Sequence, residues 1–429
     1  MPDSKRKSIL ILGGSFAGLT AAYELKRLAG EAHEITVVDK NEHFVFIPSL
    51  IWVPFGWRTI EQISFPLAPT LAAQGVRFLH ATARWIDPAR QTVTISQANG
   101  GERELFYDYL LVATGPHADF AMVEGLGPDG GYTVSICTAP HAIEAGRAWR
   151  EFLREPGPVI VGATQEAACY GAAYEFVFNL EYALRKVGLR DRVPITYLTS
   201  EPFAGHFGIG GMKWAREMTE WFFRHTGIDW VLDAVVEKVS PGMVHLRQGR
   251  LHRAAAKNGR PEDLSGGSLP FRYAMIIPRF LGVPVVRDSG LGNARGFVVV
   301  DDYFRHLQHR NIYAAGVSVA VAPPEPCPSG CSVPKTGYIS EVMAKYAARN
   351  ILADIDGRPL VPKPATEIDA KCLMDAGNQG IIMLTDRIYV PSRHRKTELL
   401  IPGPWAHWAK VAFEKYALWK MRTGRVAWP

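Results

Sequence analysis

Residues 8–39 constrain the fold of this chain more than any other stretch. The apolar run 8–12 predicts a buried strand, and a glycine turn separates it from a helical pattern over residues 19–28. A second apolar strand, 35–38, runs into Asp39. Strand, turn, helix, strand and acid in this order predict a parallel βαβ unit that binds a dinucleotide.

The turn of this unit has the chemistry that a dinucleotide requires, although Ser15 stands where the middle glycine of the common pattern belongs. Gly13 and Gly18 let the backbone approach a pyrophosphate, and the start of the helix attracts its charge. Asp39, which follows Gly18 by 21 residues, can accept hydrogen bonds from a ribose. The alternative is the glycine-rich turn of an ordinary α/β domain. We expect the cofactor to contact Gly13, Gly14, Ser15, Ala17, Gly18, Asp39 and Lys40.

A second strand–turn–helix pattern occupies residues 158–175, but its turn does not suit a dinucleotide. Gly162 follows a buried strand, whereas Thr164 and Ala167 stand where the second and third glycines belong. Cys169 lies two residues further on. The pattern therefore predicts a second Rossmann-like domain that has lost its nucleotide and carries a thiol near the turn.

Length, cysteine content and charge limit the class of protein. A chain of 429 residues suggests two to three domains, and five cysteines are too few for a disulfide scaffold. No apolar run approaches 18 residues, and the basic N-terminus enters the first strand too early for a cleavable signal peptide. Residues 393–429 hold eight Lys or Arg and two Glu, which equals the whole net charge of +6. A basic, aromatic tail fits an anionic lipid surface better than a nucleic acid.

Two further strands indicate a flavin. Residues 107–115 read YDYLLVATG and residues 311–316 read NIYAAG. Both resemble the turns of two-dinucleotide-domain flavoproteins of the disulfide-reductase-like superfamily. The resemblance implies FAD held by a discontinuous domain, 1–125 and 286–360, with a second domain, 126–285, inserted in it. The additional cofactor contacts that it implies are Thr114, Gly115 and Gly316.

Six motifs spread over nearly the full chain resemble those of bacterial sulfide:quinone oxidoreductases. They are SICTAPH (135–141), GATQEAACYGAAYE (162–175), SEPFAGHFGIGG (200–211), VPKTGY (333–338), AKCLMDAG (370–377) and HWAKVAFEKY (407–416). The resemblance implies three redox cysteines, Cys137, Cys169 and Cys372, of which the last two are bridged beside the flavin directly or through extra sulfur atoms.

Thiolate exchange explains why such a bridge would suit the reaction. Hydrosulfide is a soft nucleophile that would open the bridge, leaving a persulfide on Cys169 and a thiolate on Cys372. The thiolate would reduce FAD, and two electrons would then pass to a quinone. Cys137 has two roles in the family, sulfur-chain handling and a flavin tether, and both stay open. The alternative for each cysteine is a small buried apolar side chain.

The same resemblance implies roles for four polar residues. Glu175, His141 and His206 match positions that move protons or shape sulfide access, and histidine exchanges protons near neutral pH. Lys335 would place a positive charge near the pyrimidine edge of the flavin. The alternatives are satisfied structural residues for the first three and a surface lysine for Lys335.

Residues 404–420 predict an amphipathic helix in a C-terminal segment, 361–429. Interleaved lysines suit a helix that lies in a bilayer interface, so we expect a peripheral, monotopic membrane protein. Lys410 and Phe413 match family quinone-site positions, a cation to polarise a carbonyl and a ring to stack on it. The alternative is a terminal helix packed on its own core or on a partner subunit. The predicted lipid-facing positions are Trp405, Trp408, Ala412, Tyr416 and Trp419.

One loop departs from the family pattern. It carries Cys327 and Cys331, where a disulfide, a sulfur relay and two idle thiols are all open, and we favour idle thiols. A zinc ion would need two further ligands, which the loop does not offer, so we expect no metal site.

These expectations combine into an α/β fold with two Rossmann-like domains, the second inserted in the first, and a C-terminal amphipathic helical segment. The predicted function is a FAD-dependent enzyme that oxidises hydrosulfide to zero-valent sulfur or polysulfide and reduces a membrane quinone. The alternatives are a type II NADH:quinone dehydrogenase, a flavocytochrome c sulfide dehydrogenase subunit and a non-catalytic flavin-binding scaffold. The sequence leaves open the quinone type, the product chain length, covalent attachment of FAD, the membrane face and whether the chain forms a homo-oligomer.

Overall fold

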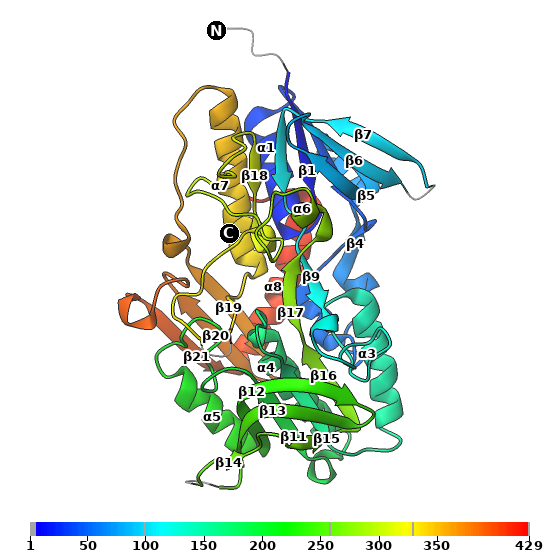
Figure 1. The fold of residues 1–429 in the computed structure, drawn as a ribbon, viewed down its shortest axis with the longest axis vertical. Helices are drawn as coiled ribbons and strands as arrows, with labels where there is room; N and C mark the ends of the chain where they lie inside the picture. The colour runs from blue at the N-terminus through cyan, green and yellow to red at the C-terminus, as the bar shows by residue number, and fades with distance from the viewer. Residues whose placement is uncertain (1–5, 98–99, 257–258, 328–329, 428–429) are drawn as a thin grey trace.

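The computed structural model describes residues 6–97, 100–256, 259–327 and 330–427 and is elongated, with one large sheet toward each end (Figure 1). The first sheet runs β18, β8, β1, β2, β5, β6, β7 in spatial order, and its first five strands are parallel. The strands are β1 (Ser8–Leu12), β2 (Glu34–Asp39), β5 (Arg77–Asp87), β6 (Thr92–Gln97), β7 (Glu102–Phe106), β8 (Tyr109–Val112) and β18 (Ile312–Ala314). β18 comes from a segment that follows the whole second sheet.

The second sheet runs β14, β13, β12, β11, β10, β16 in spatial order; its last four strands are parallel and its other edge is antiparallel. Its strands are β10 (Val159–Ala163), β11 (Ile195–Thr199), β12 (Ile228–Ser240), β13 (Met243–His252), β14 (Glu262–Asp263), β15 (Ser268–Pro270) and β16 (Tyr273–Ile277). Two antiparallel strands, β9 (Pro116–Asp119) and β17 (Arg279–Gly282), connect the two halves (Figure 1). The predicted fold class is therefore confirmed.

The two strand–turn–helix units differ in where the helix begins. Helix α1 (Phe16–Ala29) starts three residues earlier than the pattern predicts, directly after the glycine turn. Helix α4 (Tyr170–Lys186) starts only after six intervening residues, with Cys169 at its N-cap. In that interval the N–H of Thr164 donates to the carbonyl of Ile277 at 3.0 Å. The second turn therefore differs from the first in the longer interval between its strand and its helix.

The other elements cover these sheets or join them. Helix α7 (Gly337–Ile355) packs on α1, and a large hydrophobic core continues from the first sheet through α4 to the C-terminal region. The remaining elements used below are α3 (Ala139–Phe152), α5 (Ala215–Thr226), η1 (Ile47–Trp52), η5 (Gly316–Ser318) and η7 (Ser392–His394). The minor ones are β3 (His43–Val45), β4 (Ser64–Pro66), α2 (Leu67–Ala72) and α6 (Pro284–Asp288).

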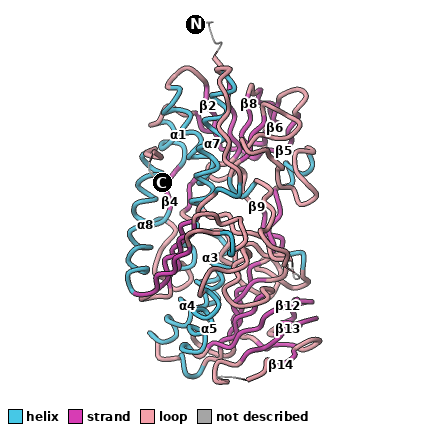
Figure 2. Tube along the Cα trace, turned by 90° about the vertical axis from the view of Figure 1, so that its left-hand side faces the viewer, coloured by secondary structure: helices cyan, strands magenta, loops and turns pink. Residues whose placement is uncertain are grey.

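The C-terminal segment is a three-stranded antiparallel sheet followed by one helix. Strands β19 (Ala370–Asp375), β20 (Gly380–Thr385) and β21 (Glu398–Gly403) lead into α8 (Pro404–Thr423), which runs along the outer edge of the molecule (Figure 2). Within the described residues, no helix combines the length and apolar character needed to cross a bilayer.

Helix α8 presents the predicted aromatic face but not the predicted lysines. Trp405, Trp408 and Trp419, called the tryptophan face below, are 68%, 67% and 46% exposed. Lys410 and Lys420 point the other way, are buried, and pair with carboxylates of α4 and α7. The prediction that interleaved lysines face a bilayer is therefore wrong for these two, because the inner side of α8 packs on acidic side chains.

Candidate active site

The turn after β1 has no room for side chains at its glycines. Gly13 has a φ of +111°, and a Cβ there would lie 2.2 Å from the carbonyl oxygen of Ala113. A Cβ on Gly18 would lie 1.7 Å from the carbonyl oxygen of Gly13. Ser15 makes no side-chain capping bond, so the first N–H groups of α1 keep the free hydrogen-bonding capacity that suits a phosphate.

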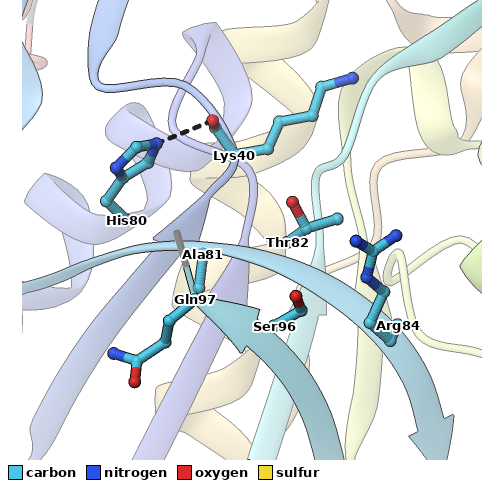
Figure 3. Close-up of a pocket in the computed structure, with 7 residues that line it drawn as sticks. All are labelled: Lys40, His80, Ala81, Thr82, Arg84, Ser96 and Gln97. Atoms are coloured by element: carbon cyan, nitrogen blue, oxygen red, sulfur yellow. Dashed lines mark hydrogen bonds between the residues drawn. The ribbon is translucent and has the colours of Figure 1, made fainter. Parts of the chain in front are cut away.

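Asp39 lies against this turn and beside a pocket. Its Oδ2 accepts from the N–H of Gly14 at 2.5 Å, and its Oδ1 accepts from the backbone of Asn41 at 2.7 Å. Lys40 borders a polar pocket of about 280 Å³, where His80 Nε2 lies 3.0 Å from its carbonyl oxygen (Figure 3). The pocket is lined by Lys40, His80, Ala81, Thr82, Arg84, Ser96 and Gln97. The end of β2 therefore contributes to the turn through Asp39 and to the pocket through Lys40.

The predicted contacts from distant segments converge on the same edge of the sheet. Ser318 Oγ accepts from the N–H of Gly115 at 3.1 Å and lies 3.3 Å from Thr114 Oγ1. Gly316 has a φ of +72°, and a Cβ there would meet the Cβ of Ala17 at 3.0 Å. The turns that follow β1, β8 and β18 therefore meet, as a single cofactor site requires.

Lys335 lies at this junction. Its Nζ donates to the carbonyl oxygens of Val317 at 3.0 Å and Val319 at 2.6 Å. Burial lowers the pKa of Lys335 to about 7. An anion placed next to the ammonium would favour its charged form, so this lysine is suited to a negatively charged ligand.

Three half-buried thiols come from three elements: Cys137 precedes α3, Cys169 caps α4 and Cys372 lies within β19. All three are free, so the predicted bridge between Cys169 and Cys372 is not present in the structure. Burial raises the pKa of Cys137 to about 11 and of the other two to about 12. A thiolate is therefore poorly stabilised here and is a strong electron donor once formed.

The thiols share their site with a buried ion pair, Glu175–Lys410. The pKa of Cys372 is raised most by burial and next by the charge of Glu175, whereas Lys410 lowers it. Cys137 and Glu175 both raise the pKa of Cys169. Charge effects in a buried site fall off with distance, so the three thiols and the ion pair share one region of the protein, called the thiol site below.

Glu175 is held in a position to exchange a proton. Its Oε1 accepts from Lys410 Nζ and, at 2.7 Å, from the N–H of Asp375. Burial raises the pKa of Glu175 to about 7, although Lys410 opposes this shift. Lys410 also lies 5.2 Å from the centre of the Trp52 ring of η1. Phe413, on the same helix, is half-buried with its ring 6.0 Å from that of Phe46.

The two predicted histidines make their contacts elsewhere. His206 is buried, burial lowers its pKa to about 4, and its Nδ1 accepts from the N–H of Gly208 at 3.2 Å. His141 lies near the start of α3, with Nε2 3.6 Å from the carboxylate of Asp129 and its ring against Phe120. Their roles stay predictions.

One polar contact of this region was missed by the sequence analysis. His407 Nδ1 lies 2.7 Å from Asp375 Oδ1, and Trp52 Nε1 donates to Asp375 Oδ2 at 2.8 Å. His407 and Lys410 stand one helical turn apart in HWAK, which is the signal that could have indicated a shared site.

The loop that carries Cys327 and Cys331 also differs from expectation. Cys327 and Cys331 form a disulfide, so the favoured interpretation of two idle thiols is wrong. The loop leans on the turn before α4, because the N–H of Ser332 donates to the carbonyl of Ala167 at 3.0 Å. Two cysteines four residues apart on a loop can approach each other without regular secondary structure, so no helix or strand periodicity in the sequence predicts this disulfide.

Two Rossmann-like sheets, a dinucleotide turn on the first and thiols at the altered turn of the second define a disulfide-reductase-like flavoprotein. Residues 7–326 match the pyridine nucleotide-disulphide oxidoreductase family. The sulfide-quinone reductase of Aquifex aeolicus is 36% identical over 98% of this chain and 92% of its own length. The X-ray structure of the sulfide:quinone oxidoreductase from that bacterium matches with a TM-score of 0.87 over the same shares. The mitochondrial sulfide:quinone oxidoreductase of Mus musculus is 22% identical over 72% of this chain and 64% of its own length.

The chain therefore belongs to the sulfide:quinone oxidoreductases, within the pyridine nucleotide-disulphide oxidoreductases. The family resemblance inferred from the six motifs is confirmed.

Proposed function

We propose that this protein is a FAD-dependent sulfide:quinone oxidoreductase, which oxidises hydrosulfide to zero-valent sulfur or polysulfide and passes two electrons to a membrane quinone. The observation that carries the proposal is the thiol site, where Cys169 and Cys372 share one region with the Glu175–Lys410 pair of α4 and α8. The six motifs and the 36% identity over 98% of the chain support it.

In this proposal the turns of the first sheet would hold FAD. Gly13, Gly14, Ser15, Ala17 and Gly18 would hold its pyrophosphate at the start of α1, in a turn whose close packing requires glycine at positions 13 and 18. Asp39 binds the ribose and Lys40 borders the adenosine pocket. Thr114, Gly115, Gly316 and Lys335 hold the other end. FAD, when bound, takes an electron pair from the thiol site and releases it to the quinone.

The cysteines make and break the sulfur bonds. Hydrosulfide attacks a Cys169–Cys372 disulfide, forms a sulfur–sulfur bond to Cys169 and releases the Cys372 thiolate, so that no electron leaves the protein in this step. The raised pKa of Cys372 makes its thiolate a good electron donor. Glu175, whose pKa is about 7, takes the proton that the Cys169 persulfide loses as the sulfur chain closes. Cys137 extends or receives the sulfur chain, and His141 and His206 shape the approach of sulfide.

The C-terminal segment serves the quinone. Lys410 polarises one quinone carbonyl and Phe413 packs on the ring. The tryptophan face enters the interface of an anionic bilayer, where indole rings are favoured, so that a bilayer-soluble quinone reaches the site. We keep the domain limits proposed above, 1–125 with 286–360, 126–285 and 361–429.

Cysteine variants test the assignment of the bridge. Cys169→Ser and Cys372→Ser should each bind FAD but abolish flavin reduction by sulfide under anaerobic conditions, because neither can form the bridge. The matched control, Cys327→Ser with Cys331→Ser, removes two cysteines outside the thiol site and should retain most of the rate. Loss of the reaction in the control but not in the single variants would reverse the assignment.

A further inference from the structure

Two polar side chains of α8 stand one turn apart on its inner side. Lys410 is 2% exposed and paired with Glu175, whereas the His407 side chain is 23% exposed and paired with Asp375 of β19. The ring of His407 lies 5.3 Å from that of Trp408, a member of the tryptophan face. His407 therefore stands where the buried site meets the exposed face of the helix.

The hydrogen bond with Asp375 fixes which ring nitrogen can exchange protons. A carboxylate only accepts hydrogen bonds, so His407 Nδ1 carries the hydrogen in the 2.7 Å contact with Asp375 Oδ1. Asp375 is itself held by Trp52 Nε1 at 2.8 Å and by the N–H of Gly377 at 3.3 Å. Its orientation is therefore set by three donors, and Nε2 is the ring nitrogen of His407 that is not used in the contact with Asp375.

The charges around His407 come from a few elements. β19 contributes Asp375, α4 contributes Glu175, and α8 itself contributes Lys410. β20 adds no charge at this place, because its residue next to Ala406 is Gly380. Glu414 lies two turns further along α8 and pairs with Arg58, from the loop after η1, at 2.9 Å.

The overall reaction needs one proton from solvent. Hydrosulfide and a quinone give zero-valent sulfur and a quinol only if two protons reach the two quinone oxygens, and hydrosulfide supplies one of them. In the function proposed above, on which this inference rests, the proton from hydrosulfide passes through the thiol site and the Glu175–Lys410 pair. A second donor that refills from solvent is required, and Lys410, being buried, is poorly placed for it.

We propose that His407, oriented by Asp375, is the second proton donor to the quinone. Its imidazolium gives the Nε2 proton to the carbonyl oxygen opposite the one polarised by Lys410, as the electron pair arrives from FAD. Neutral His407 keeps its Nδ1–H, which it still donates to Asp375, and takes a new proton at Nε2 from water. The one-turn spacing on α8 suits a ligand with two carbonyl groups.

His407→Asn tests this donor in the full-length, FAD-loaded enzyme. The asparagine amide can still donate to Asp375 but cannot carry a proton. Sulfide first reduces the flavin anaerobically, and a short-chain quinone then reoxidises it in a separate mixing step. His394→Asn, which changes an exposed histidine of η7, is the matched control.

The expected result separates the two half-reactions. In His407→Asn, reduction by sulfide should be unchanged, whereas reoxidation should slow about 100-fold and lose its decline with rising pH. Added imidazole should restore part of the rate, and His394→Asn should behave as the parent. Proton NMR should show a downfield imidazole N–H signal that is absent in His407→Asn.

Two results would overturn the inference. One is a His407→Asn variant that keeps the parent rate and pH profile of reoxidation. The other is a slower variant with the parent pH profile and no response to imidazole, which would assign His407 a structural role. Failure of sulfide to reduce the flavin of the parent enzyme would instead contradict the proposed function.

Discussion

Replacing Lys420 by methionine tests how α8 is attached to the rest of the protein. Lys420 Nζ lies 2.6 Å from Glu341 Oε2 of α7, and the two side chains are 1% and 4% exposed. Burial raises the pKa of Glu341, and the lysine charge opposes that shift. Lys420→Met therefore leaves a buried carboxylate without its main partner.

The structure sets the size of the effect. Removing one member of a buried ion pair typically costs about 3–5 kcal/mol. Lys345 also lowers the pKa of Glu341 and stays in place, so we expect the lower end, about 3 kcal/mol at pH 7. A carboxyl whose folded pKa is raised costs stability only as it ionises, so the loss should shrink as pH falls toward 4.5.

Urea unfolding of the FAD-loaded protein, followed by circular dichroism, measures this loss. Lys415→Met is the matched control, since Lys415 lies on the same helix with 66% of its side chain exposed, and it should change stability by less than about 0.5 kcal/mol. The double variant Lys420→Met, Glu341→Met replaces the pair by apolar side chains of similar volume and should recover most of the loss. The reasoning is refuted if Lys420→Met behaves as Lys415→Met, or if the double variant is as unstable as the single one.

Two further predictions concern the membrane and pH. Changing all three residues of the tryptophan face to serine should abolish the salt-resistant part of binding to anionic liposomes in a flotation assay, while the FAD content stays unchanged. The reason is that salt screens charge but does not weaken the burial of indole rings. Salt-resistant binding by the triple variant would place the lipid contact elsewhere. Burial raises the pKa of Glu201 to about 7, so the protein should lose stability as pH rises from 4.5 to 7. In unfolding experiments, Glu201→Gln should reduce the change in unfolding free energy between pH 4.5 and 7 by on the order of 3 kcal/mol. An unaltered pH profile would contradict the assignment of this change to Glu201.

Local features of the fold could be predicted from the sequence. The turn after β1 depends on glycines and an acid within 27 residues, from Gly13 to Asp39, and the structure places Asp39 against Gly14 as expected. The aromatic face of α8 depends only on helical spacing, and its three tryptophans are exposed as predicted. The family resemblance supplied the cysteines and Lys410, which no periodicity indicates.

Features that depend on distant partners could not be predicted. Lys410 and Glu175 are 235 residues apart, so nothing in the pattern of α8 shows that this lysine is buried. Lys420 faces α7 for the same reason. His407 and Asp375 lie in two separate motifs, and only the packing of α8 on β19 brings them together. A helical pattern shows which side chains share a face, whereas their partners depend on what covers that face.

Anaerobic reduction of the bound flavin by sulfide and by NADH is the most direct test of the account. The turn after β10 has Thr164 and Ala167 in place of two glycines, and six residues separate this strand from the start of α4 at Tyr170, so a nicotinamide dinucleotide lacks the usual glycine turn there. Sulfide should bleach the visible flavin band within seconds, through Cys169 and Cys372, and NADH at the same concentration should not. Rapid bleaching by NADH with none by sulfide would contradict the account.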